Sequence, residues 1–170
     1  MINIPNSVTS IGAGAFLYCR NLTSISIPSS VLTIENNTFS SCENLTTLNI
    51  ADGVKEIKGS PFSGCKKLTS LVIPNGVTSI ERSTFSGLSG LKSVTLSESV
   101  EVIRPTPFDT SPNLAEIIIK NPELKIESSK SIPFKVTIYG YTGSTAQEFA
   151  EKYNRTFIAL DESPETAPVT

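Results

Sequence analysis

The chain has 170 residues, and its 14 Lys and Arg residues against 16 Asp and Glu residues give a formal net charge of −2. A protein without a basic excess cannot neutralise a phosphate backbone, so we expect no nucleic-acid partner. The chain contains no histidine, which excludes Ser-His-Asp and Cys-His catalysis and every His-ligated metal site. We therefore expect no catalytic site, no metal site and no cofactor, and we predict that the chain is not an enzyme.

The first residues are predicted to belong to a strand of a repeating structure. Ile2 and Ile4 precede Ile25 and Ile27 by a step that recurs along the whole chain. The chain thus opens inside a repeat, and we expect further coils upstream in a longer protein. This segment lacks the charged and apolar regions of a signal peptide. No apolar run in the chain approaches the roughly 20 residues of a membrane span, so no membrane insertion is expected.

A repeat with a constant step of twenty-three organises the chain. Phenylalanine recurs at this step, at Phe16, Phe39, Phe62, Phe85 and Phe108. Five further apolar columns hold the same register through five repeats, and they start at Val8, Ile11, Leu22, Ile25 and Ile27. We interpret the Phe column as a core spine and not as a stacking platform for bases or sugars, because other apolar columns flank it at fixed offsets.

Each repeat ends with alternating apolar and polar residues, as in the segment before Pro74, which is the signal of a β-strand. A repeat of this length is too short for a strand, a long helix and two turns. It suffices for one coil of a solenoid, with a short strand, a turn and an extended or 3₁₀ return. The predicted fold is therefore a mostly β repeat solenoid with a parallel sheet. Its domain is residues 1–132, with five full repeats, a partial first and a degenerate sixth.

Residues 133–160 are predicted to be a C-terminal cap with the order strand, helix, strand. Val136 and Ile138 indicate the first strand, which arrives about four residues early in the repeat. A last short strand is predicted at Thr156–Leu160. A cap is required because the last coil of a solenoid has no neighbour. Residues 161–170 are expected to be an acidic, Pro-containing linker or tail.

A helix is predicted within this cap. Ser144 and Gln147 are spaced as a capping box, with Ser144 as the N-cap. One apolar stripe follows at helical spacing, formed by Ala146, Phe149, Ala150 and Tyr153. The stripe is expected to cover the open end of the last coil.

The three cysteines occupy one column of the repeat. Cys19, Cys42 and Cys65 share it with Leu88 and Ser111, which indicates a position for a small or apolar group. Parallel Cβ vectors on adjacent coils give poor disulfide geometry, and three thiolates without a fourth ligand do not make a zinc site. We predict buried free thiols.

Asparagine recurs just before the strands. Asn21, Asn44 and Asn113 hold this column, with Lys67 and Gly90 in the other two coils. Asn and Gly tolerate a positive φ. A turn role is therefore predicted for these positions.

The outward positions of the strands are the candidate partner-binding face. They alternate with the core positions, and they are Ser24, Ser26, Thr47, Asn49, Ser70, Val72, Ser93, Thr95, Glu116 and Ile118. These side chains are short and nearly uncharged and include no aromatic anchor, so a solvated strand surface is the alternative interpretation. A binding role has support from the solenoid class, because concave sheets are where solenoids usually bind.

The repeat resembles the BspA-like leucine-rich repeats of bacterial surface proteins. The resemblance rests on coils such as Val77–Phe85 followed by L-x-x-L-x-I strands, and on F-x-x-C in three coils. The I-P-x-x-V joint, at Ile27–Val31 and Ile73–Val77, belongs to the same pattern. The segment Thr137–Leu160 is similar to the C-terminal cap that often closes these arrays.

This resemblance implies an extracellular or cell-surface bacterial protein with adhesive or host-binding roles. Our leading hypothesis is a non-catalytic binding module that recognises a protein or a glycan on the solenoid face. The alternative is a structural spacer that presents other domains of a longer surface protein. Neither hypothesis places a signal or an anchor within this chain.

Overall fold

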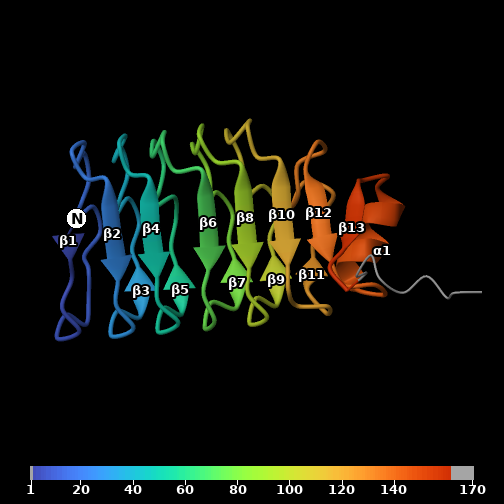
Figure 1. The fold of residues 1–170 in the computed structure, drawn as a ribbon, viewed down its shortest axis with the longest axis horizontal. Helices are drawn as coiled ribbons and strands as arrows, with labels where there is room; N and C mark the ends of the chain where they lie inside the picture. Colours follow the sequence, from blue (N-terminus) through green and yellow to red (C-terminus); the bar gives the residue numbers. More distant parts are fainter. Residues whose placement is uncertain (1, 162–170) are drawn as a thin grey trace, which may run out of the picture.

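The computed structural model describes residues 2–161, which wind into a β-solenoid of parallel strands (Figure 1). One face carries the long strands side by side, with the two-residue β1 at its start: β1 (Ile2–Asn3), β2 (Ser24–Ile27), β4 (Thr47–Ile50), β6 (Ser70–Ile73), β8 (Ser93–Leu96), β10 (Glu116–Ile119), β12 (Thr137–Gly140) and β13 (Phe157–Ala159). The returns carry short strands: β3 (Thr33–Ile34), β5 (Glu56–Ile57), β7 (Ser79–Ile80), β9 (Val102–Ile103) and β11 (Lys125–Ile126). The predicted fold class is confirmed. After each short strand the returns run through hydrogen-bonded turns, such as the one closed by the N–H of Cys42 and the carbonyl of Phe39, and residues 2–161 contain no 3₁₀ segment.

Neighbouring coils pair with a step of one repeat. Ile25 pairs with Leu48, and Leu71 pairs with Val94, which in each case is the same position one repeat further on. This register places identical repeat positions side by side, so an apolar column stays apolar through the stack. Because successive side chains of a strand point to opposite faces, every second residue enters the core and the others face outward.

The Phe column is a core spine, as predicted. Phe39, Phe62 and Phe85 are fully buried, and Phe108 is 4% exposed. The rings of Phe85 and Phe108 stack with centroids 5.1 Å apart. Phe16 in the first coil is only partly buried, because no coil within residues 2–161 covers its outer side.

The cysteines follow the same distribution. Cys42 and Cys65 are buried free thiols, whereas Cys19 is only partly buried. The prediction of three buried thiols is therefore wrong for Cys19. Its coil is the first complete one in the described chain, and one side of it lacks a neighbour.

The Cys column has a hydrogen-bonding role that the sequence pattern did not indicate. The thiol of Cys42 donates to the carbonyl oxygen of Phe16 at 3.0 Å. Ser111 repeats this contact, with its hydroxyl donating to the carbonyl of Phe85 at 2.6 Å. The column thus favours a small donor and not simply a small or apolar side chain.

Asn21, Asn44 and Asn113 lie in turns, as predicted, but none of them has the positive φ that motivated the prediction. The Asn44 side-chain amide donates to the carbonyl of Arg20 at 2.8 Å, and that of Asn113 donates to Ser89 at 2.7 Å. The positive φ lies three residues earlier in the turn, as at Ser41 with φ 59°. The amide ties the turn to the preceding coil, which explains why the column favours Asn.

The sixth coil is shorter than the others. Ile138 pairs with Ile117, and the step between them is two residues shorter than a full repeat. The strand β12 therefore arrives two residues early, not about four. β13 pairs in parallel with β12, for example Ile158 with Tyr139, and extends the sheet by one more strand.

The helix α1 (Thr145–Lys152) lies between β12 and β13 in the chain. Ser144 is the N-cap, and its side chain accepts the N–H of Gln147 at 3.3 Å. The other half of the predicted capping box is shifted by one residue, because the Gln147 oxygen accepts the N–H of Gly143 at 2.8 Å. The buried residues of the helix are Ala146, Phe149 and Ala150.

One boundary between coils lacks strand pairing. Within residues 2–161, β4 and β6 are not hydrogen-bonded neighbours, and neither are β5 and β7. Figure 1 shows a wider space between β4 and β6 than between the other long strands. We call this boundary, between residues 47–57 and 70–80, the seam.

Two side chains account for hydrogen bonds that the seam lacks. Leu88 occupies the Cys column next to the seam, and it has no hydrogen to donate to the carbonyl of Phe62. Pro74 has no N–H. At the same repeat position one coil earlier, Ala51 donates its N–H to the carbonyl of Ile27 at 3.1 Å.

The aromatic spine is also interrupted at the seam. Phe39 and Phe62 stack with centroids 6.2 Å apart, but in the described part of the chain no stacked pair joins Phe62 to Phe85. Ile50 at the end of β4 is only partly buried, whereas Ile27 at the same position of β2 is buried. The coils on either side of the seam therefore touch less closely than other neighbours.

Candidate functional site

All ten predicted face residues lie on the outer side of the long strands, and none of them is buried. The strand pairing aligns them in two rows. The first row is Ser24, Thr47, Ser70, Ser93 and Glu116, and the second is Ser26, Asn49, Val72, Thr95 and Ile118. The seam divides both rows, so the four residues of β2 and β4 belong to one sheet and the other six to the next.

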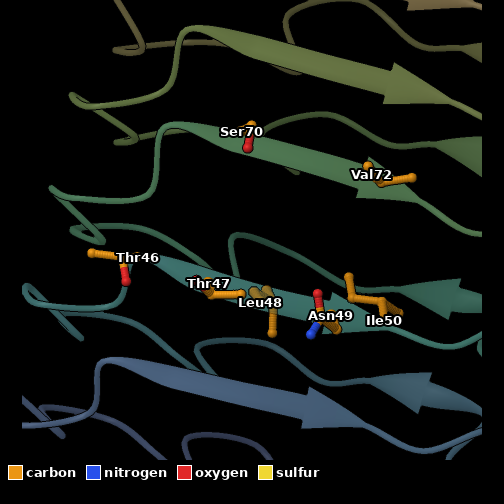
Figure 2. Close-up of a pocket in the computed structure, with 7 residues that line it drawn as sticks. All are labelled: Thr46, Thr47, Leu48, Asn49, Ile50, Ser70 and Val72. Atoms are coloured by element: carbon orange, nitrogen blue, oxygen red, sulfur yellow. The ribbon is translucent and has the colours of Figure 1, made fainter.

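The seam opens a cleft in this face (Figure 2). It has a volume of about 260 Å³ and lies between β4 and β6, with Thr47, Asn49, Ser70 and Val72 among its lining residues. The lining side chains are mostly short and polar. Beside the cleft, the Asn49 amide donates to the hydroxyl of Ser26 at 3.3 Å. The cleft is a feature that the repeat pattern alone does not predict.

An aromatic residue extends the face beyond the predicted set. Tyr139 of β12 pairs with Ile118 of β10, and Ile158 of β13 pairs with Tyr139. Ile158 is 44% exposed, and the other two are partly exposed. The prediction of a face without an aromatic anchor holds for β2 to β10 but not for the whole sheet. The alternation of Val136 to Gly140 was the signal that could have placed Tyr139 on this face.

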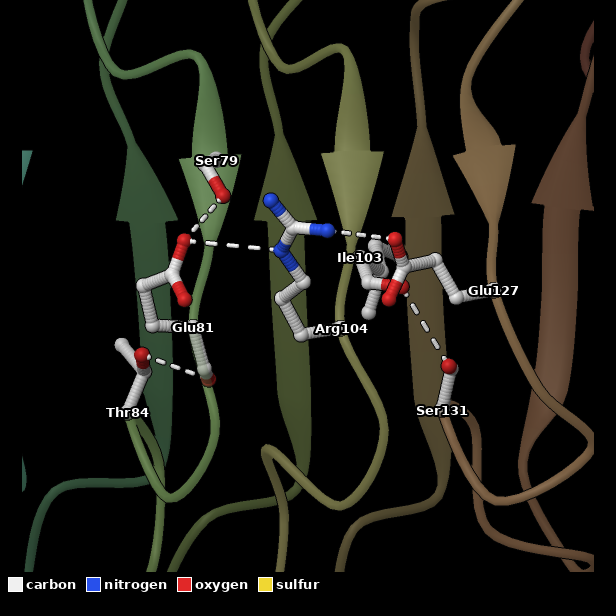
Figure 3. Close-up of polar contacts among 7 residues, drawn as sticks. All are labelled: Ser79, Glu81, Thr84, Ile103, Arg104, Glu127 and Ser131. Atoms are coloured by element: carbon white, nitrogen blue, oxygen red, sulfur yellow. Dashed lines mark hydrogen bonds and ion pairs between the residues drawn. The ribbon is translucent and has the colours of Figure 1, made fainter.

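The return side of the solenoid has a different character (Figure 3). A column of alternating charge runs along it, formed by Glu35, Lys58, Glu81, Arg104 and Glu127. Lys58 lies 3.1 Å from the Glu35 carboxylate, and Arg104 contacts both Glu81 and Glu127. Within the described residues no ion pair joins Lys58 to Glu81, which stand on either side of the seam. Exposed pairs of this kind add little stability individually.

The buried thiols are poor nucleophiles and poor metal ligands. Burial raises the pKa of Cys42 to about 11 and that of Cys65 to about 12, with the neighbouring thiol of the column as a second cause. The thiolate is the form that binds metals and attacks electrophiles, so these groups are protonated at neutral pH. Residues 2–161 contain no cluster of three or more Cys, Asp or Glu side chains that could hold a metal ion. No helix in that range is long and apolar enough to cross a bilayer.

The family is decided by the repeats themselves. A model of the BspA type leucine rich repeat region matches in six copies, over residues 1–115 and 60–131. The chain belongs to the BspA-type leucine-rich repeat family. The sequence-based resemblance is thereby confirmed. A comparison with curated protein sequences found no significant match.

Solved structures of bacterial proteins share the fold of this BspA-type chain. The pneumococcal vaccine antigen PcpA matches with a TM-score of 0.77 and 18% identity, over 95% of this chain and 41% of that one. A leucine rich cell surface protein from Faecalibacterium prausnitzii A2-165 matches with a TM-score of 0.65 and 31% identity, over 76% of this chain and 32% of that one. The T. pallidum leucine rich repeat protein matches with a TM-score of 0.66 and 23% identity, over 92% and 84%. The chain thus spans less than half of the first two proteins.

Proposed function

We propose that this chain is a non-catalytic binding module of a cell-surface or secreted bacterial protein. The ligand is a protein or a glycan, and it contacts the outer strand face. Family membership and the likeness to a cell-surface protein of Faecalibacterium prausnitzii support the location. The proposal assigns no catalysis to the chain, which has no histidine.

The observation that carries the binding proposal is the row Ile118, Tyr139 and Ile158. These residues lie next to each other on β10, β12 and β13 and remain accessible. Tyrosine is enriched at the energetic centres of protein interfaces, and an aromatic ring with a hydroxyl also offers a surface for a sugar ring. Ser93 and Thr95 of β8 continue the face toward the seam, and their hydroxyls supply hydrogen-bonding groups.

The test compares three forms of the full chain on a glycan array and on a panel of extracellular host proteins. The parent should bind at least one ligand saturably. The double variant Tyr139→Ala/Ile158→Ser should weaken that binding by about tenfold or more, which is about 1.4 kcal/mol. Leu32→Ser is the matched control, because Leu32 is an exposed apolar residue outside the strand face.

The alternative function is a rigid spacer that presents other domains. The linear stack of coils favours it, since each coil contacts its neighbours along one axis (Figure 1). A spacer predicts no saturable binding in either panel. Binding that is equally strong in the Tyr139→Ala/Ile158→Ser variant would place the ligand elsewhere on the solenoid.

A further inference from the structure

A second surface lies away from the strand face, where the aromatic spine ends. Ser131 stands one full repeat after Phe108 and takes the place of a sixth phenylalanine. Ser131 is buried, and its hydroxyl donates to the carbonyl of Ile103 at 3.3 Å (Figure 3). A serine cannot cover the ring of Phe108, and the sixth coil is also two residues shorter than the others. A gap therefore remains between the turns that precede β10 and β12.

This gap is a groove of about 420 Å³, which we call the loop groove. Its lining includes Phe108, Asp109, Pro112, Lys130, Phe134 and Lys135. Phe134 is 68% exposed, although it falls in the column that Cys42 and Cys65 occupy as buried residues. The loop groove thus combines an apolar lining with an exposed ring.

The Phe134 ring is held in place from one side. The Arg155 guanidinium stacks on it, with its central carbon 4.6 Å from the ring centroid. Arg155 is itself fixed by a hydrogen bond from Nη2 to the carbonyl of Ser129 at 3.1 Å. An exposed aromatic that is already ordered loses little conformational entropy when a partner covers it.

The charges of the loop groove favour an anionic partner. Lys130 and Lys135 line it, Arg155 stacks on its exposed ring, and Asp109 is its single acidic lining residue. Among residues 2–161, none of the three cations forms an ion pair. This local excess is positive, although the net charge of the whole chain is −2.

Main-chain donors point to the same kind of partner. Phe16 and Phe85 donate their N–H groups to the next coil, to Thr38 at 2.9 Å and to Pro107 at 2.8 Å. For the equivalent N–H of Phe108, the described chain provides no carbonyl of the sixth coil as acceptor. An extended peptide that supplies carbonyl oxygens can satisfy such an edge, as in strand addition.

We propose that the loop groove binds an extended acidic peptide segment of a partner protein. An apolar side chain of the peptide packs against Phe134 and Phe108, and its carboxylates face Lys130 and Lys135. The peptide main chain accepts from the N–H of Phe108. This site is separate from the strand face and does not depend on the function proposed for that face.

The test is an NMR titration of the ¹⁵N-labelled full chain with a short synthetic peptide that is rich in glutamate and carries one phenylalanine. We expect saturable shifts centred on residues 106–114 and 130–135. Raising NaCl to about 0.5 M should weaken binding, because screening shortens the reach of the lysine charges. Two control peptides replace either the glutamates by lysine or the phenylalanine by serine, and both should bind about tenfold more weakly or worse.

Protein variants locate the contact. Phe134→Ser and the double variant Lys130→Glu/Lys135→Glu should each weaken binding by about tenfold. Leu32→Ser and Lys67→Glu/Lys92→Glu are matched controls on exposed positions elsewhere. The two groove variants replace different residues, so either one keeps the test valid if the other fails to fold.

Several outcomes would overturn the proposal. These are no saturable shifts, shifts centred outside the loop groove, and equal binding of the lysine peptide. Unchanged affinity in both groove variants would have the same meaning. A sulfated oligosaccharide that binds the groove without dependence on Phe134 would reassign it to an anionic glycan.

Discussion

At the scale of single residues, the inner side of the solenoid depends on small donors that reach the coil before them. The Cys65 thiol donates to the carbonyl of Phe39 at 3.1 Å, and burial raises its pKa to about 12. The same environment raises the pKa of Cys42 to about 11. A thiol that stays protonated keeps its hydrogen bond and is a poor nucleophile, so both structure and reactivity depend on burial.

Thiol labelling of the native protein is expected to distinguish the cysteines. At about pH 8, Cys19 should react quickly because it is partly exposed, whereas Cys42 and Cys65 should react only after denaturation. The measurement is the time course of a chromogenic disulfide reagent with and without urea. Cys19→Ser should remove the fast phase. Rapid labelling of all three thiols would contradict the core position of this column.

The same thiols predict a loss of stability in alkali. The folded pKa values of Cys42 and Cys65 lie above the ordinary thiol value of 9.0, so the unfolded chain releases these protons first. Their contribution is complete below about pH 9 and is lost as the pH rises toward 11 and 12. Urea unfolding across this range measures it. Cys42→Ser/Cys65→Ser should flatten the slope, since Ser111 shows that a hydroxyl makes the same hydrogen bond.

Phe62→Ala should cost about 3–5 kcal/mol of unfolding free energy, because it removes a fully buried ring from the spine. Phe16→Ala is the matched comparison in the same column, and it should cost less because Phe16 is only partly buried. The urea midpoints of both variants measure the difference. Equal midpoints for Phe62→Ala and the parent would show that the column does not stabilise the core.

At the scale of elements, the chain end is predicted to protect the last coil. Deleting residues 140–170 removes α1 and β13 and exposes Ile138 on an unpaired parallel edge, which is a template for association. We expect aggregation or partial unfolding, measured by light scattering and thermal melting. Phe149→Ser should act in the same direction, because Phe149 is a buried residue of α1.

The control for that deletion is a shorter truncation, in which Asp161 is the last residue. Its carboxylate accepts the N–H of Thr142 at 3.0 Å, and this bond lowers the pKa of Asp161. Residues 162–170 lie outside the described residues, and the linker or tail assigned to them stays a prediction. Removing only these residues should leave the melting temperature unchanged. Equal damage from both deletions would place the end of the cap later in the chain.

The repeat pattern predicted the strands because Ile25, Leu48 and their equivalents must share one face of a parallel sheet. It could not predict the loop groove, because the two missing residues of the sixth coil become visible only through the pairing of Ile117 with Ile138. The repeat pattern also placed Leu88 in the cysteine column as an equivalent small or apolar residue. A cysteine is a small apolar residue by composition, and its role as a donor depends on the position of the carbonyl one coil earlier.

At the scale of the whole molecule, a solenoid is held by nearest-neighbour interfaces, so its weakest interface decides where it opens. The seam lacks pairing in both rows of strands, ring stacking between Phe62 and Phe85, and the ion pair between Lys58 and Glu81. These absences within residues 2–161 coincide at one boundary. The molecule therefore consists of two better-paired blocks, and the proposed binding face crosses the junction between them.

Hydrogen exchange should locate this junction. Leu48 of β4 and Leu71 of β6 hold the same repeat position, but Leu71 pairs with Val94 while Leu48 has no paired strand on the seam side. The Leu48 amide should exchange at least about tenfold faster, which corresponds to about 1.4 kcal/mol or the net value of one to two hydrogen bonds.

Hydrogen exchange at low urea concentrations should then give one opening free energy for the amides of β2 and β4 and a different one for those of β6 to β12. A single value for all strands would mean that the seam opens no more readily than the other interfaces. Because each block keeps its own paired sheet, opening at the seam should change the angle between the two halves of the face without melting either half.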